Sequence, residues 1–165
     1  RLNFPERKYE MSSGDDRWRR TLYTHRQRSA PHPLLASFDA TSGEECVAAR
    51  NRANIPQQAL GLLNDPGFVA AARGLAARML AAPGDDAARI AAGMRLVLAR
   101  TATAEEAAVL VDLLKHHRAH YAADAKAAQA LADGDGAGKG PPAERAAWTS
   151  VARVLLNQHA AITRN

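Results

Sequence analysis

The class of fold is set by residues 65–79, which read Asp-Pro-Gly-Phe-Val-Ala-Ala-Ala-Arg-Gly-Leu-Ala-Ala-Arg-Met. Asp65 can accept a hydrogen bond from the first turn of a helix, and Pro66 suits the first helical position because its missing N–H is not needed there. Apolar side chains recur at intervals of three and four, which predicts a helix with one buried face. They are Phe68, Val69, Ala72, Leu75, Ala76 and Met79.

Similar sequence patterns, which predict helices, continue through the rest of the chain beyond residue 55. Thr103 and Glu106 form the pattern of a capping box, in which each side chain bonds the backbone of the other residue. Residues 133–142 are rich in Gly, Asp and Pro and predict an exposed, mobile loop. We expect helices over 56–64, 65–79, 85–98, 103–121, 124–131 and about 143–159. The sequence therefore predicts a mainly α fold, a bundle of about five helices over residues 56–165.

Residues 1–55 have a different composition, because they are polar, rich in Arg and broken by Pro and Gly. The β-branched and aromatic residues of 19–25 predict a strand that Pro31-His32-Pro33 closes. Residues 37–39 predict a second short extended piece. We expect this region to be an irregular N-terminal extension with one or two short strands, packed on the bundle as part of a single domain.

Charge and composition exclude several classes of protein. The net charge is +5, with ten Lys/Arg against seven Asp/Glu up to Pro56 and twelve against ten beyond it. This mild, dispersed excess and the lack of a basic aromatic motif argue against nucleic-acid binding. No apolar run is long enough to span a membrane. Because the sequence starts at Arg1 without a leader, we expect either that the protein is processed or that the chain is part of something longer. The favoured interpretation is the C-terminal part of a larger exported protein.

Cys46 is the single cysteine, which excludes an internal disulfide, a four-Cys zinc site and a C-x-x-C-H haem attachment. A nucleophile pair of Cys46 with His25 or His32 is conceivable, but a small buried thiol explains Cys46 better. The Asp133–Gly136 stretch resembles part of a calcium loop but lacks the further ligands, including a suitably placed Glu. We therefore predict no metal and no catalytic residue in these segments.

Three histidines lie on the helix expected over 103–121. His116 and His120 are four residues apart and share a helix face, so both could reach one metal ion. Lys115 and Arg118 beside them would repel a cation, and a solvated face is the favoured interpretation. His117 falls on the apolar stripe and is interpreted as a half-buried packing residue.

The densest charge feature lies in the first region and carries aromatic residues. Arginine forks suit carboxylate, sulfate or phosphate groups, and the aromatics could stack on a sugar or anchor the segment. Pairing with the acids of the same region is the favoured alternative. The candidate anion- or partner-binding residues are Arg17, Trp18, Arg19, Arg20, Tyr23, Arg26 and Arg28.

Several short blocks along the chain occur in a recognisable order. They are residues 19–24, 31–33, 38–39, 46, 50, 52, 54–60, 62–69, 88–90, 98–100, 105–106, 147–148, 155–157 and 163–164. Together they resemble the C-terminal domain of unknown function in planctomycete-type, cytochrome c-associated exported proteins. The chain departs from that pattern at Ile55, where Thr is common, and at His25-Arg26-Gln27, where aromatics are usual.

The resemblance implies a setting more than an activity. Such proteins are large and exported, commonly with an N-terminal c-type cytochrome module, and their genes often accompany sulfatases. It implies a periplasmic or cell-surface location, a c-type haem upstream of this chain and none within it, and other domains or subunits as partners. No catalytic residues are established for the domain. We therefore expect a non-catalytic structural or interaction domain rather than an enzyme.

An alternative hypothesis makes the arginine-rich segment a module that binds anions or sulfated carbohydrate in polysaccharide degradation. It predicts that a sulfated oligosaccharide raises the melting temperature of the chain, and that the double substitution Arg19→Ala, Arg20→Ala removes the rise. Thermal unfolding with and without the oligosaccharide measures this. No shift at millimolar ligand would contradict the hypothesis.

Overall fold

The structure, a computed structural model, describes residues 12–24, 31–51, 53 and 55–163. The chain forms two compact units, Arg1–Ala53 and Asn54–Asn165. That the first region packs on the bundle stays a prediction.

The described residues form helices and no β-strand, so the prediction of a mainly α fold is confirmed and that of one or two short strands is wrong. None of these helices is both long and apolar enough to cross a membrane. The 3-10 helices are η1 (Gly14–Trp18) and η2 (Thr21–Tyr23). The α-helices are α1 (Pro33–Ser37), α2 (Pro56–Asn64), α3 (Pro66–Ala81), α4 (Asp86–Leu98), α5 (Ala104–Ala123), α6 (Ala125–Ala132), α7 (Pro142–Leu156) and α8 (His159–Ile162).

Side-chain caps fix the start of four helices in the second unit. Asp65 accepts a hydrogen bond from the N–H of Gly67 at the start of α3, and Asp85 and Asp124 cap α4 and α6 in the same way. Thr103 forms the predicted capping box with Glu106 at the start of α5. These caps satisfy N–H groups that have no partner within the helix.

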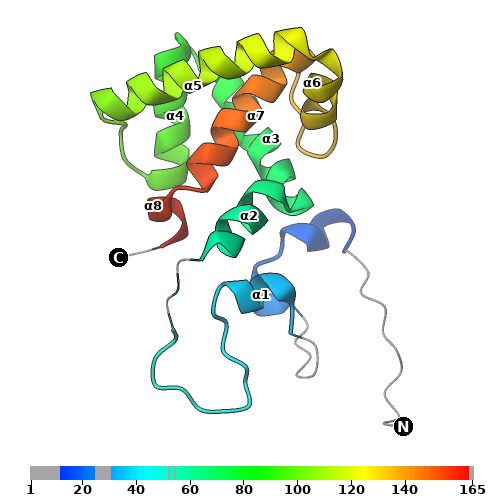
Figure 1. Ribbon diagram of the computed structural model, residues 1–165, viewed down its shortest axis with the longest axis vertical. Helices are drawn as coiled ribbons and strands as arrows, with labels where there is room; N and C mark the ends of the chain where they lie inside the picture. The colour runs from blue at the N-terminus through cyan, green and yellow to red at the C-terminus, as the bar shows by residue number, and fades with distance from the viewer. Residues whose placement is uncertain (1–11, 25–30, 52, 54, 164–165) are drawn as a thin grey trace. The chain divides into compact units, whose positions relative to one another are not determined.

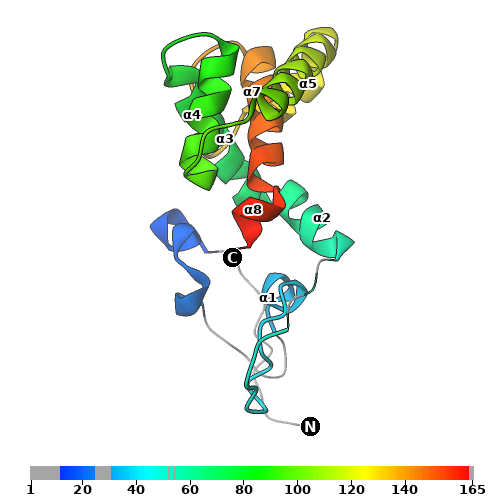
Figure 2. The same ribbon diagram turned by 90° about the vertical axis from the view of Figure 1, so that its left-hand side faces the viewer.

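Helix α7 is the centre of the helical unit. Figure 2 shows it with α3 and α4 on one side and α5 on the other, and Figure 1 shows α6 beside it and α8 beyond its C-terminal end. Residues 146–152 are buried without interruption, and Leu155 is buried one turn later. The predicted terminal helix is shorter than expected, because α7 ends at Leu156 before α8 begins.

The core joins α7 to its neighbours through large side chains among small ones. The fully buried large residues include Met79, Ile90, Met94, Leu114, Trp148, Val151 and Leu155. Alanines between them let the helices approach closely. At Gly93 a Cβ atom would lie 2.7 Å from the Met79 side chain, so this glycine lets Met79 of α3 pack directly on α4.

The loop between α6 and α7 is exposed, as expected, but it lies close against α3 and is hydrogen-bonded to α7. Arg145 of α7 donates to the Gly140 carbonyl (3.0 Å) and to the Asp133 carboxylate (2.9 Å), and Arg73 of α3 donates to the Leu131 carbonyl (2.7 Å) near the end of α6. Gly136, at φ +81°, lies so close to α3 that a Cβ atom would be 2.4 Å from the Ala70 carbonyl oxygen. The glycines that predicted mobility are needed for this close approach.

The first unit contains short helical turns where strands were predicted. Within residues 19–25, Thr21–Tyr23 form η2, and Tyr23 donates its N–H to the Arg20 carbonyl (2.9 Å); His25 lies outside the described residues. A strand must pair its backbone with another strand. None occurs in the described part, and the segment instead bonds within itself.

The second predicted strand, residues 37–39, is also wrong. Ser37 ends α1, which Pro33 opens and His32 caps by accepting the Leu34 N–H at its Nδ1 atom (3.2 Å). Asp39 then adopts a left-handed conformation at φ +54°. Pro33 therefore starts a helix rather than closing a strand.

A clasp closes the loop that follows α1. Arg50 donates from Nε to the Asp39 carbonyl (2.9 Å) and from Nη2 to the Phe38 carbonyl. The Ala53 N–H donates to the Asp39 carboxylate (2.7 Å). Residues 40–49 therefore leave and return at one point, in the manner of an Ω-loop.

The substitution Gly136→Ala tests whether the α6–α7 loop packs against α3. We expect a loss of at least about 2 kcal/mol in the free energy of unfolding, because the new Cβ clashes with α3 in a backbone region that disfavours side chains. Chemical denaturation measures the loss. The matched control is Gly74→Ala in α3, where a Cβ meets nothing within 4 Å. This substitution should raise the free energy of unfolding by up to about 1 kcal/mol. Equal stability of both variants would contradict this packing.

Candidate functional site

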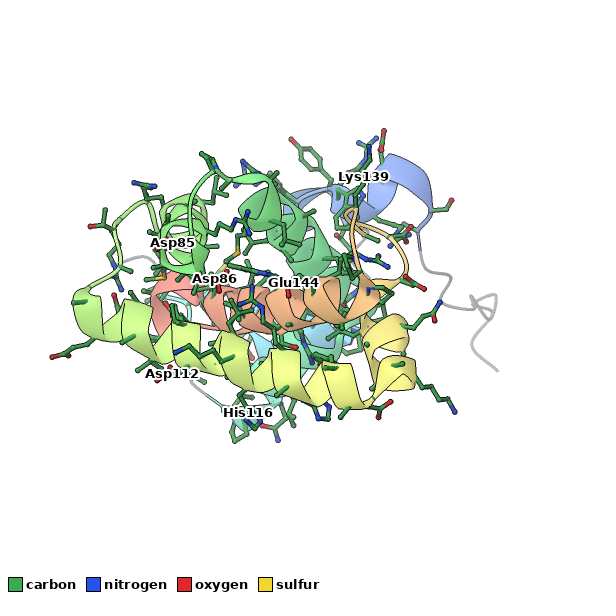
Figure 3. All side chains as sticks on the ribbon, turned by 90° about the horizontal axis from the view of Figure 1, so that it is seen from above. Asp85, Asp86, Asp112, His116, Lys139 and Glu144 are labelled. Carbon is green, nitrogen blue, oxygen red and sulfur yellow. The ribbon has the colours of Figure 1, made fainter. Side chains whose placement is uncertain are left out.

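A charged cluster joins α4, α5 and α7 at one side of the α5–α7 contact. Arg118 of α5 donates from Nε to Glu144 (2.9 Å) and from Nη2 to Asp86 (2.9 Å). Asp86 and Glu144 lie in the first turns of α4 and α7, and Figure 3 shows both on the same side of α5. Trp148 donates its indole N–H to Glu144 (2.8 Å), and the Arg118 guanidinium carbon lies 5.9 Å from the Trp148 ring centroid.

The interactions within the cluster keep all three side chains charged. Hydrogen bonds from Arg118 hold the pKa of Asp86 and of Glu144 below its usual value, and the two carboxylates raise the pKa of Arg118. The positive ends of the α4 and α7 dipoles favour the same acidic residues. The three side chains are each about one third exposed, so the cluster is neither dry nor freely solvated.

This arrangement suits holding helices together better than proton transfer. A general acid needs a carboxyl that keeps its proton near neutral pH, and the lowered pKa values of Asp86 and Glu144 work against that. The guanidinium occupies the space between the carboxylates where a metal ion would have to lie. The sequence does not predict this cluster, because Arg118 bonds residues 26 and 32 positions away and no local pattern marks such partners.

The histidines on α5 take separate positions. His116 and His120 are exposed, and His116 lies on the other side of α5 from Asp86 and Glu144 in Figure 3. His117 is half-buried and stacks on Tyr121 (ring centroids 5.9 Å apart, planes at 19°). Burial, followed by the charges of His116, His120 and Arg153, lowers the pKa of His117. No group of three potential metal ligands occurs among the described residues.

The structure also places the remaining residues that were considered as candidates, and it contradicts the favoured interpretation only for Cys46. Cys46 is exposed, not buried, and lies in the clasped loop. The Nδ1 atom of His32 caps α1. Asp133 of the calcium-like stretch accepts a hydrogen bond from Arg145 (2.9 Å), and this arginine lowers its pKa.

The structure places five of the seven candidate partner-binding residues on η1, η2 and the link between them. Arg17 lies 5.6 Å from the centroid of the Trp18 ring, and Arg19 pairs with Asp16 (2.6 Å) with both side chains about 64% exposed. Trp18 and Tyr23 expose 53% and 68% of their surface. Arg26 and Arg28 lie outside the described residues. The predicted pairing of arginines with local acids is thus seen at Arg19.

Comparison with known families places the chain in a family. The model of the family described as PSD1, protein of unknown function (DUF1553), matches residues 1–114. The chain belongs to this family. The matched range covers the first unit and continues into α5, so the shared blocks at 147–148, 155–157 and 163–164 lie beyond it. No curated protein and no solved structure matches the DUF1553 chain significantly.

The substitution Arg118→Met tests the charged cluster. It leaves two carboxylates facing each other without a cation, and we expect a loss of about 2–4 kcal/mol, the lower end reflecting the partial exposure. The lowered pKa values mean that the cluster stabilises the wild type above pH ~4.5. That contribution is lost as the pH falls through the folded-state pKa values.

The measurement is chemical denaturation at several pH values. In Arg118→Met the acidic part of the stability profile should flatten or reverse, whereas the matched control Arg95→Met, an exposed residue of α4, should keep the wild-type profile. An unchanged profile in Arg118→Met would contradict the structural role of this cluster.

Proposed function

We propose that this chain is a non-catalytic structural and interaction domain of a larger exported protein linked to a c-type cytochrome. The observation that carries the proposal is the closed pairing of Arg118 with Asp86 and Glu144. In this cluster one cation and two carboxylates bond to each other and thereby join α4, α5 and α7. A catalytic cluster, by contrast, would present a group with a pKa tuned for the reaction.

The first unit carries the surface that we propose for interaction with other proteins. None of its described residues is buried, and Trp18, Leu22 and Tyr23 each expose more than half of their surface. Exposed aromatic and aliphatic side chains gathered in a short segment mark surfaces that bind other proteins. The partners that we propose are other domains or subunits of the parent assembly.

The cytochrome link and the location are supported by the resemblance of the sequence to planctomycete-type exported proteins. A c-type haem needs two cysteines and a histidine, and Cys46 stands alone. The haem is therefore proposed for a region upstream of this chain, in the periplasm or at the cell surface. No contact among the described residues favours the sulfated-carbohydrate alternative over an interaction role.

The test isolates the natural protein with an antibody raised against this chain. We expect a species far above 17.6 kDa in the exported fraction, with the absorption spectrum of a covalently bound haem. A haem-free species of the chain's own mass, retained in the cytoplasm, would contradict the proposal. An antibody against an abundant cytoplasmic protein controls the fractionation.

A further inference from the structure

Residues 15–23, here called the Trp18 segment, expose apolar side chains on a defined backbone. Trp18 exposes 53%, Leu22 79% and Tyr23 68% of its surface. Two 3-10 turns, η1 and η2, hold the segment locally. Tryptophan, tyrosine and arginine are the residues most enriched at the energetic centres of protein interfaces. The segment therefore has the composition of a contact surface.

The order of charges along the Trp18 segment is self-complementary. Asp15 and Asp16 begin it, Arg19 and Arg20 follow the tryptophan, and Arg17 adjoins Trp18. When two such segments run antiparallel, the acidic half of each meets the basic half of the other. A contact about a twofold axis requires this kind of self-complementarity.

We propose that the Trp18 segment is the surface through which two copies of this chain associate about a twofold axis. The proposal rests on the interaction role proposed above and names the partner as a second copy. In the contact, Trp18, Leu22 and Tyr23 of both copies lose their exposure to water. The aspartates and arginines form ion pairs at the two ends.

The ion pair within one copy does not prevent this exchange. Asp16 and Arg19 are 2.6 Å apart, but both side chains are about 64% exposed, and such pairs contribute little to stability. Arg19 can therefore turn to an aspartate of the second copy at little cost. Arg17, 5.6 Å from the centroid of the Trp18 ring, can likewise stack on the tryptophan of the second copy.

The same features disfavour a polyanion as the occupant. Residues 15–23 carry three arginines and two aspartates, a net charge of only +1. A sulfated chain carries many negative charges and would be repelled by the aspartates. Leu22, the most exposed of the three apolar residues, offers no flat ring for stacking on a sugar, whereas it can fill space in a protein contact.

The exposed area indicates a weak dimer. Trp18, Leu22 and Tyr23 together offer on the order of 300–400 Å² per copy, so a contact between two copies buries about 700 Å² from these residues. Stable interfaces bury about 1,200–2,000 Å² in total. We therefore expect association that depends on concentration in the micromolar range rather than a permanent dimer.

Sedimentation equilibrium of the full chain over a wide concentration range tests the apolar part. The wild type should show a dimer fraction that rises with concentration, and Trp18→Ala with Tyr23→Ala should raise the dimer dissociation constant at least about tenfold. The matched control is Leu60→Ala with Val109→Ala in the helical unit, where these residues expose 57% and 68%. It should associate as the wild type does.

Charge reversal tests the twofold pairing. One variant carries Asp15→Arg and Asp16→Arg, and the other carries Arg19→Asp and Arg20→Asp. Each should be monomeric alone, because like charges then meet at both ends, and an equimolar mixture should form a heterodimer. Lys126→Asp with Lys139→Asp, exposed in the helical unit, controls for net charge and should dimerise normally.

The outcomes separate this inference from the proposed function. A wild type that stays monomeric at the highest concentration overturns the second copy as the occupant, whether or not the chain binds sulfated oligosaccharide. A mixture of the two charge variants that stays monomeric overturns the twofold pairing. Neither result affects the size, location and haem content of the natural protein, which test the proposed link to an exported cytochrome.

Discussion

The burial of residues 146–152 of α7 on all sides is the constraint on which the helical unit depends. A helix that is buried over seven consecutive residues, 146–152, must be enclosed by other helices, since no face of it can meet water without loss. Its alanines keep the helix thin, so α3, α5 and α6 can all reach it. The larger anchors, Trp148 above all, then fill the space between the backbones.

The packing of α7 against its neighbours places a charged residue, Glu144, at the contact between helices. Glu144 stands one turn before Trp148, where the first turn of α7 meets α4 and α5. An unpaired carboxylate there would oppose the packing that buries the tryptophan. Arg118 resolves the conflict by bonding Glu144 and Asp86 together. The ring of Trp148 then lies beside a guanidinium and donates to the same carboxylate.

Local signals made the helices predictable, whereas the contacts between them were not. Asp65, Asp85 and Thr103 mark helix starts by bonding the next few residues, so short windows of sequence reveal them. Arg118 bonds residues 26 and 32 positions away, which no local pattern encodes. The strand over residues 19–25 was mispredicted for the related reason that β-branched composition says nothing about an available partner strand.

The exposed loop of residues 40–49 and the α6–α7 loop differ in their contacts with the rest of the chain. This difference decides where the chain can be engineered. The ends of residues 40–49 are joined by Arg50 and Asp39, so the loop can be lengthened or carry a fluorescent label while its base stays closed. The α6–α7 loop is fastened along its length, through Gly134, Gly136 and Gly138, to α3. An insertion there would lift the loop from the helix. Residues 40–49 are the place for a reporter.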